Sequence, residues 1–326
     1  MKKLNARETQ VAIKLIKDYF ERELSKKLNL TRVSAPLFVR PESGLNDDLT
    51  GAEKAVNFEL TKYKEYVEIV QSLAKWKRLA LKWYGFEYDE GIYTDMNAIR
   101  PDEVLDDTHS IYVDQWDWEK VIKKNDRNED YLINIVKDIY CVFKEAEKYI
   151  NSLYPETLTE KLPDEITFIT AQELEDLYPN LNEKEKENAI TKKHKAIFLY
   201  KIGNKLKSGQ PHGTRSPDYD DWELNGDIIF WNPVSNQALE LSSMGIRVDE
   251  ISLEKQLKLA NAEHRKALEY HKALLNGELP YTVGGGIGQS RICMFFLEKQ
   301  HIGEVQASVW TKEIVDKCNE KGIFLL

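Results

Sequence analysis

Four glycines followed by an arginine form the most distinctive chemical pattern in the chain. Residues 284–291 read GGGIGQSR, which fits neither the dinucleotide-binding fingerprint nor the Walker pattern. Glycines such as Gly286 let the backbone approach a flat ligand closely. A helix expected over 289–299 would offer its N-terminus to an anion, and Arg291 can stack on a ring or fork onto a phosphate. The pattern predicts a nucleotide site, with an ordinary loop before a helix as the alternative.

A second polar pattern lies upstream, where residues 240–249 read ELSSMGIRVD. On a strand, alternate residues share a face, so Glu240 and Ser242 are expected to point to the same side. Gly245 should bend the chain before Arg247. An acid, two hydroxyls and an arginine could hold a metal, a nucleotide and a carboxylate, and a polar edge strand is the alternative.

Two further segments carry candidate groups. Arg100 closes a strand expected over 92–99, and residues 110–118 read SIYVDQWDW. Gln115 and Asp117 fall on the strand face of Val113, so they indicate either a satisfied core network or a site. The acidic runs at 47–48 and 218–221 are typical of solvated loops.

Composition excludes several classes of protein. The chain has 326 residues, and 46 Lys and Arg against 55 Asp and Glu give a net charge of −9, which argues against a protein that grips a nucleic-acid backbone. Cys141, Cys293 and Cys318 form no C-x-x-C pair, so we expect a reduced, cytoplasmic protein without a disulfide framework or structural zinc. We expect no signal peptide and no membrane span, because residues 1–20 are repeatedly charged and the longest apolar run is 292–297.

The elements that position these groups can be read from hydrophobic periodicity. Helices are expected over 6–28, 72–84, 119–154, 171–178, 183–194, 250–276 and 289–299, with Ser72 as an N-cap. Strands are expected over 30–39, 56–60, 66–70, 92–99, 110–118, 165–169, 196–200, 227–231 and 238–248. Because the strands come in hairpin-like groups, the pattern favours an α+β fold with a mostly antiparallel sheet flanked by helices. We expect one catalytic domain over residues 1–326, with a helical flank at about 119–195.

Together these segments resemble the core of the class II aminoacyl-tRNA synthetases. Pro36, in a strand after a long helix, is similar to motif 1, Arg100 to the motif 2 arginine, and residues 284–291 to motif 3. The chain resembles in more detail the ammonia-dependent asparagine synthetases (aspartate–ammonia ligases), from about residue 5 to the C-terminus. The segments that carry this resemblance are 50–56, 72–78, 100–103, 109–119, 225–227, 240–249 and 284–291.

The resemblance implies a cytoplasmic, homodimeric enzyme of asparagine biosynthesis. Such a ligase uses ATP and Mg²⁺ to convert the β-carboxylate of L-aspartate into a β-aspartyl adenylate, with release of pyrophosphate. Ammonia then displaces AMP to give L-asparagine. No nucleic acid and no membrane is expected as a partner.

The resemblance also assigns the nucleotide site. Arg100, the first catalytic candidate, is expected to bind the α-phosphate and the reacting carboxylate through a bidentate fork. Arg291 should lie against the adenine or the distal phosphates. Asp227 and Glu240 are the expected Mg²⁺ ligands, since this cation prefers hard oxygen atoms. The remaining nucleotide-binding residues are expected to be Ser110, Val113, Asp220, Ser242 and Gly286.

The aspartate site must hold a carboxylate and an ammonium group. Lys77 and Arg247 suit the α-carboxylate, and Gln115 and Asp117 suit the ammonium. Asp47 and Gln115 are the other catalytic candidates, with Asp47 expected to attract ammonium and take its proton. The full aspartate-binding set is Asp47, Ser72, Lys77, Arg100, Gln115, Asp117, Ser243 and Arg247.

Three rival interpretations remain at this point. A truncated aspartyl- or asparaginyl-tRNA synthetase core predicts an RNA-binding β-barrel or a basic face, which the net charge of −9 disfavours. A non-catalytic relative would be expected to lose Arg100, Glu240 or Arg291, and all three are present. A glutamine-dependent amidotransferase needs a cysteine after the initiating methionine, where this chain has Lys2.

Overall fold

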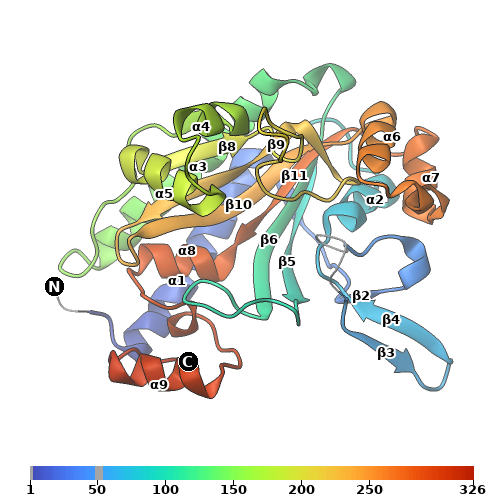
Figure 1. Cartoon of the computed structure of the whole chain (residues 1–326). Coiled ribbons are helices and arrows are strands. Elements are labelled where there is room, and N and C mark those ends of the chain that lie inside the picture. The colour runs from blue at the N-terminus through green and yellow to red at the C-terminus, as the bar shows by residue number, and fades with distance from the viewer. Residues whose placement is uncertain (1–2, 48–53) are drawn as a thin grey trace.

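A computed structural model of the chain describes residues 3–47 and 54–326, so Asp48 and the first part of the 50–56 segment lie outside the described residues. The centre is an eight-stranded sheet with the order β1-β5-β6-β11-β10-β9-β8-β7 (Figure 1). Only its two outermost pairs, β1–β5 and β7–β8, are parallel, so the prediction of a mostly antiparallel sheet is confirmed. The strands are β1 (Leu30–Arg32), β5 (Gly91–Ile99), β6 (Tyr112–Val121), β7 (Thr167–Thr170), β8 (Ala196–Tyr200), β9 (Asp220–Asn232), β10 (Gln237–Arg247) and β11 (Thr282–Gly288).

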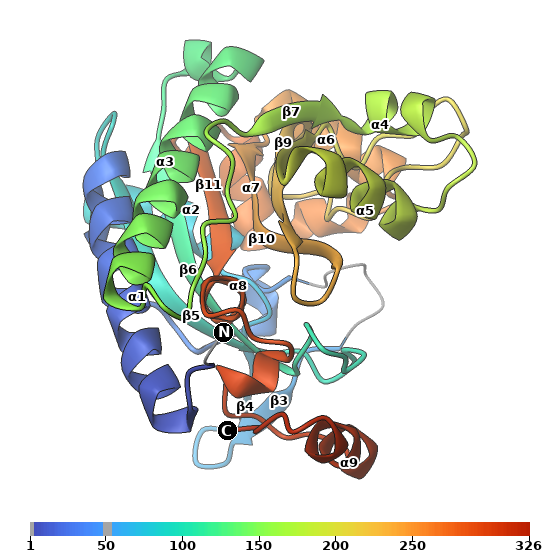
Figure 2. The same cartoon turned by 90° about the vertical axis from the view of Figure 1, so that its left-hand side faces the viewer.

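One face of the sheet carries a continuous apolar core. The helices on this face are α1 (Ala6–Leu28), α3 (Glu129–Leu153) and α8 (Gln289–Phe296). Figure 2 shows α1 and α3 side by side. Between them and the strands lies the largest apolar cluster, where Phe143 packs edge-on against Phe20 with ring centroids 4.9 Å apart. Burial of these aromatic rings against the sheet therefore holds both long helices in place.

The opposite face carries two separate apolar clusters, one at each end. The helices around the β5 end are α2 (Ala74–Tyr84), α6 (Glu250–Leu259) and α7 (Glu269–Leu275). The helices around the β7 end are α4 (Ala171–Leu177) and α5 (Glu183–His194). Neither cluster includes a residue of β11. The middle of this face is therefore open to polar chemistry.

Two smaller parts complete the described chain. A three-stranded sheet, ordered β2-β4-β3, projects at the lower right of Figure 1. Its strands are β2 (Phe38–Val39), β3 (Asn57–Leu60) and β4 (Glu65–Ile69), and helix α9 (Lys312–Glu320) lies near the C-terminus. No helix among the described residues combines the length and apolar character needed to cross a bilayer.

Several element boundaries differ from the sequence-based expectation. The strand expected over 30–39 is two short strands, β1 and β2, in different sheets, with Pro36 between them. The helical flank expected from 119 begins at Glu129, because β6 continues to Val121, where it pairs with Thr282 of β11. Residues 250–276 form α6 and α7 with a 3₁₀ turn between them. Ser72 is not the N-cap of α2, since Leu73 holds that position.

We expect Phe143→Ala to destabilise the fold by about 3–5 kcal/mol, because it leaves a cavity between α3 and the sheet. The measurement is urea unfolding followed by circular dichroism. Tyr63→Ala, whose side chain is 74% exposed, serves as the control and should change stability little. Equal unfolding midpoints for the two variants would contradict the assignment of the core to this face.

Candidate active site

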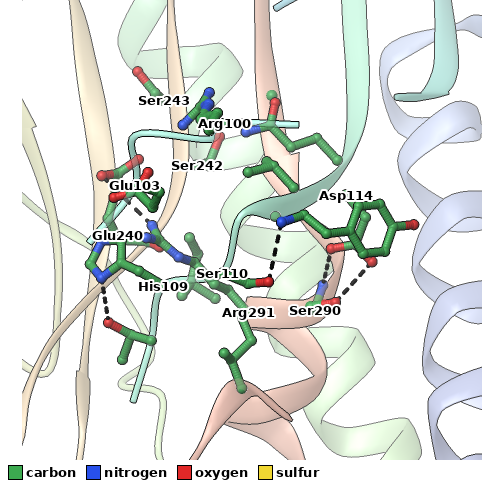
Figure 3. Close-up of a pocket in the computed structure, with 18 of the residues that line it drawn as sticks. Arg100, Glu103, His109, Ser110, Asp114, Glu240, Ser242, Ser243, Ser290 and Arg291 are labelled. Atoms are coloured by element: carbon green, nitrogen blue, oxygen red, sulfur yellow. Dashed lines mark hydrogen bonds and ion pairs between the residues drawn. The ribbon is translucent and has the colours of Figure 1, made fainter. Parts of the chain in front are cut away.

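A cavity of about 310 Å³ lies over the polar middle of the sheet (Figure 3). Its walls come from β6, β10, β11 and α8, from the loops before β6 and β9, and from the segment 302–306. The predicted site residues that line it are Arg100, Ser110, Val113, Gln115, Glu240, Ser242, Ser243, Gly286 and Arg291. The structure therefore brings together groups from residue 100 to residue 291.

Strand register places the polar residues of the site on one face. Gly286 of β11 lies opposite Asp117 of β6 on one side and Ser243 of β10 on the other. Residues that pair directly share a face, and alternation adds Gln115 to the same face. The intervening Trp116 is fully buried in the core beneath the sheet. This alternation puts apolar chemistry below the sheet and polar chemistry above it.

The glycines at 284 and 286 are residues of the central strand β11, so the alternative of an ordinary loop is wrong. A Cβ atom on Gly286 would lie 2.3 Å from Oε1 of Gln115, and one on Gly284 would lie 2.0 Å from Oε2 of Glu119. The side chains of β6 fold across β11, and no other residue type leaves room for them. The glycine cluster serves close packing of side chains on a strand.

A buried cluster of charges fills the deep end of this face. Arg247 donates from Nε to Oε1 of Glu119 at 2.9 Å and from Nη2 to Oε2 at 2.7 Å, and Nη1 contacts Asp220. Burial alone would lower the pKa of Arg247, but the two carboxylates raise it well above its usual range. The guanidinium therefore stays charged although its side chain is only 2% exposed.

Lys77 of α2 makes a parallel arrangement beside Arg247. Its Nζ contacts Asp117 and donates to the carbonyl oxygens of Trp118 at 2.9 Å and Gly285 at 3.0 Å. The other carboxylate oxygen of Asp117, Oδ2, is buried and has no hydrogen-bond partner in the described part of the chain. Both predicted α-carboxylate binders therefore already hold carboxylates, and an incoming carboxylate has to share them.

Arg100 follows the last residue of β5 and lies at the cavity wall. Its Nη2 donates to the carbonyl oxygen of Gln71 at 3.4 Å, while Nε is buried without a partner among residues 3–47 and 54–326. The side chain of Gln71 donates to the carbonyl oxygen of Asp47 at 2.8 Å, so Gln71 links Arg100 and Asp47, two of the three predicted catalytic residues. Ser72 accepts from a backbone N–H of α2 at 3.2 Å and does not line the cavity.

Arg291, in the first turn of α8, lies on the other side of the cavity. It donates to the carbonyl oxygen of Glu240 at 2.9 Å, and its Nη1 lies 3.8 Å from that carboxylate (Figure 3). The neighbouring Ser290 hydroxyl donates to Asp114 at 2.8 Å, which fixes the start of the helix. Ser110 exchanges a hydrogen bond of 2.8 Å with Ser308.

Asp227 and Glu240 form the acidic part of the site. Asp227 contacts Arg215 through Oδ2, while its Oδ1 is buried with no partner among the described residues. Burial raises the pKa of Asp227 to about 6, Arg215 opposes this shift, and the nearby Glu240 adds to it. No group of three or more metal-ligating side chains occurs in the described ranges. Mg²⁺ commonly takes only one or two carboxylates together with phosphate oxygens, so this pair and its free oxygen fit such an ion.

A β-bulge changes one predicted alternation. The register between β10 and β9 shifts between Glu240 and Ser242. These two residues therefore lie on different faces, whereas the sequence predicted one shared face. Ser242 lies opposite Ile228, which belongs to the apolar core, and its hydroxyl is buried without a partner in the part of the chain described. Ser243 instead pairs with Asp227. A bulge inserts one residue into a strand, so the core-facing apolar positions of β10 change phase between 241 and 244.

The acidic run at 218–221 is not a solvated loop, because Asp218 and Asp220 are buried. Asp218 accepts from Lys75 at 3.3 Å and lies 2.9 Å from Nε2 of His271. These contacts anchor the loop before β9. The cavity-lining residues that were not predicted from the sequence include Glu103, His109, Arg215, Tyr219 and Gln306. The only sequence signal for Arg215 was its position just before the acidic run.

Comparison with solved structures shows which class of fold this is. The chain superposes on the asparaginyl-tRNA synthetase of Entamoeba histolytica in complex with asparaginyl-adenylate with a TM-score of 0.69 at 12% identity, over 92% of this chain and 66% of that one. The Pyrococcus horikoshii asparaginyl-tRNA synthetase complexed with asparaginyl-adenylate gives 0.66 at 14% identity, over 91% and 68%. The chain thus has the fold of a class II aminoacyl-tRNA synthetase core and spans about two thirds of those proteins.

Sequence comparison narrows this class to one family. Residues 7–322 match the aspartate–ammonia ligase family. The chain is 64% identical over 324 residues to the aspartate–ammonia ligase of Clostridium tetani, covering 99% of this chain and 95% of that protein. It is also 64% identical over 323 residues to that of Fusobacterium nucleatum, covering 99% and 98%. The chain belongs to the aspartate–ammonia ligase family.

Alanine at the two glycines should have different effects. Gly286→Ala meets the end of the flexible Gln115 side chain, so we expect a folded protein with weakened AMP binding. Gly284→Ala meets the buried Glu119–Arg247 pair, and breaking such a pair costs about 3–5 kcal/mol. Thermal unfolding and calorimetric AMP titration would check both. Equal stability of the two variants would contradict the packing described here.

Proposed function

We propose that this aspartate–ammonia ligase carries out both half-reactions in the cavity over β6, β10 and β11. The observation that carries the proposal is that Arg100, Arg215 and Arg291 line the same cavity as the carboxylate of Glu240. Three guanidinium groups and a nearby acidic pair suit a triphosphate that arrives with a divalent cation. The family relationship supplies the acceptor, which is aspartate.

In the first half-reaction, an oxygen of the aspartate β-carboxylate attacks the α-phosphorus of ATP. The bond from that phosphorus to the bridging oxygen breaks, and pyrophosphate leaves with the electron pair. Little covalent work is required of the protein, so positioning and charge neutralisation dominate. Nε of Arg100 is buried and has no partner within residues 3–47 and 54–326, and we assign to Arg100 the contact with the reacting carboxylate and the α-phosphate.

Mg²⁺ would be held by Asp227 and Glu240 together with phosphate oxygens. Its chemistry there is to neutralise phosphate charge and to fix the triphosphate in one conformation. The side chains and backbone around the ion orient the nucleotide. Arg291 lies against Glu240 and can stack on the adenine, and the backbone at Ser110, Val113 and Gly286 lines the adenosine.

Aspartate would lie above the buried charge cluster. Asp117, whose Oδ2 lacks a partner within the described ranges, accepts a hydrogen bond from the α-ammonium, and Gln115 contributes a second acceptor. Lys77 and Arg247 attract the α-carboxylate while keeping their own carboxylate partners. Because an unpaired buried carboxylate oxygen is costly, the site is completed by a ligand cation at that position.

In the second half-reaction, ammonia attacks the β-carbonyl carbon of the adenylate and AMP leaves. Ammonium is the main form at neutral pH, so a base must take its proton first. Asp47 is buried and is tied to Arg100 through Gln71. We assign to Asp47 the removal of this proton, and the neighbouring cavity is lined by Gln115.

The protein is further proposed to act as a cytoplasmic homodimer. The dimer rests on the family resemblance. The cytoplasmic location rests on that resemblance and on cysteines that are too far apart in sequence to suggest a disulfide framework. Light scattering at micromolar concentration should give twice the 37.9 kDa chain mass. A single chain mass across the accessible concentration range would contradict the dimer.

The activity is tested by incubating the protein with L-aspartate, ATP, MgCl₂ and ammonium chloride. Asparagine, AMP and pyrophosphate should form in equal amounts. ADP as the nucleotide product, or no amide, would contradict the function. The same assay with tRNA in place of ammonium should show no aminoacylation.

Asp47→Asn should separate the two half-reactions. Aspartate-dependent ATP–pyrophosphate exchange should persist, because the adenylate needs no base, while amide formation should fall about 10²- to 10⁴-fold. Asp18→Asn, an exposed carboxylate on α1, is the matched control. Equal loss in both half-reactions would remove Asp47 from the ammonia step.

A further inference from the structure

Arg215 reaches the cavity from the loop between β8 and β9. The following residue, Ser216, donates to Asp218 at 2.8 Å and accepts from the indole of Trp222 at 3.3 Å. On the preceding side, Nε2 of the buried His212 lies 3.0 Å from Glu187, and Gly213 has a φ of +65°. The Arg215 side chain is 18% exposed, so it is partly accessible from the cavity that it lines.

The contact between Arg215 and Asp227 leaves polar atoms unused on both partners. Arg215 contacts Oδ2 of Asp227 through Nη2, and its Nη1 donates to the carbonyl oxygen of Thr214 at 3.3 Å. Nε of Arg215 and Oδ1 of Asp227 are both buried and find no partner in the described residues. A bidentate arginine–carboxylate pair would satisfy both atoms. The pair therefore leaves hydrogen-bonding atoms of both residues available to other partners.

The charges around this pair favour an exchange when a nucleotide enters. Asp227 and Glu240 are the proposed Mg²⁺ ligands, and Arg215 occupies one oxygen of that acidic pair. A divalent cation at Asp227 would repel the guanidinium, since like charges a few ångströms apart repel strongly in a buried site. The same cation arrives with phosphates, and two oxygens of one tetrahedral phosphate can accept from a planar guanidinium fork.

We propose that Arg215 exchanges partners during the reaction. Without nucleotide it neutralises Asp227, and with Mg·ATP it moves to the β- and γ-phosphates. When the bond between the α-phosphorus and its bridging oxygen breaks, the electron pair goes to pyrophosphate, and Arg215 neutralises the charge that develops there. After pyrophosphate leaves, Arg215 returns to Asp227. This inference rests on the proposed function and adds to it a residue that stabilises the leaving group.

The exchange predicts opposite effects of one substitution on two ligands. In Arg215→Ala, ATP and pyrophosphate with Mg²⁺ should bind about 10- to 100-fold more weakly, the range for loss of a charge-assisted hydrogen bond. AMP, which lacks the β- and γ-phosphates, should bind as in the wild type. Free Mn²⁺ without nucleotide should bind more tightly, because its competitor for Asp227 is gone. Substitution of a residue that only stabilises the fold would weaken the binding of all these ligands together.

The experiment uses the full chain in three binding measurements. Calorimetry compares Mg·ATP, magnesium pyrophosphate and AMP, and electron paramagnetic resonance measures Mn²⁺ binding in the absence of nucleotide. The variants are Arg215→Ala, Arg215→Lys and Asp227→Asn, with Arg22→Ala on the opposite face of the sheet as the matched control. Arg215→Lys keeps a cation and should recover part of the pyrophosphate affinity, and Asp227→Asn should lose Mn²⁺ binding.

An unchanged ratio of ATP to AMP affinity in Arg215→Ala would overturn the proposal, and so would unchanged or weaker Mn²⁺ binding. If Arg215→Ala does not fold, the same readouts on Arg215→Lys decide, because that variant must still lose part of its affinity for pyrophosphate but not for AMP. Asparagine synthesis by the wild type is assayed in parallel. Synthesis together with an unchanged ATP to AMP ratio rejects the exchange alone, and absent synthesis rejects the proposed function.

Discussion

The buried contact of Arg247 with Glu119 and Asp220 is the interaction on which the site depends. It joins β10 to the adjacent strand β9 through Asp220. It also joins β10 to β6 through Glu119, across the strand β11 that lies between β10 and β6. A buried charge without partners is costly, and the cost falls only when geometry and hydrogen bonds are complete. Here the guanidinium makes a bidentate pair with one carboxylate and contacts a second. The price of this arrangement is a strand that carries glycine at 284, where any side chain would displace Glu119.

The rest of the architecture follows from keeping this polar strip apart from the apolar core. Long helices cover the other face of the sheet without interruption, while the site face is packed only at its two ends. The gap between these ends becomes the cavity. Loops then bring Arg100 and Arg215 over it, while Arg291 enters from the first turn of α8. A shared fold with tRNA synthetases therefore leaves room for a different acceptor, since acceptor choice depends on loops and side chains.

Local sequence patterns predicted the sheet and part of the cavity wall, because both depend on alternation and on the ends of elements. Period-two alternation placed Gln115 and Asp117 together, and Arg100 and Arg291 stood at element ends. These patterns did not locate the bulge that separates Glu240 from Ser242, because strict alternation was assumed along a strand whose core-facing apolar residues change phase between 241 and 244. They also indicated that Asp218 is solvated, because its partners Lys75 and His271 are distant in sequence. Arg215 was missed because it lies in a loop that no sequence motif marks, and only the fold brings it to Asp227 of β9.

The central claim is that the β-carboxylate of aspartate attacks the α-phosphorus of ATP in this cavity. The most direct measurement uses L-aspartate labelled with ¹⁸O in both β-carboxylate oxygens, with mass spectrometry of the nucleotide and of the pyrophosphate. The account predicts that each asparagine formed transfers one ¹⁸O to the phosphate of AMP, because that oxygen bridges carbon and phosphorus in the adenylate. Unlabelled AMP, or label in pyrophosphate, would contradict it.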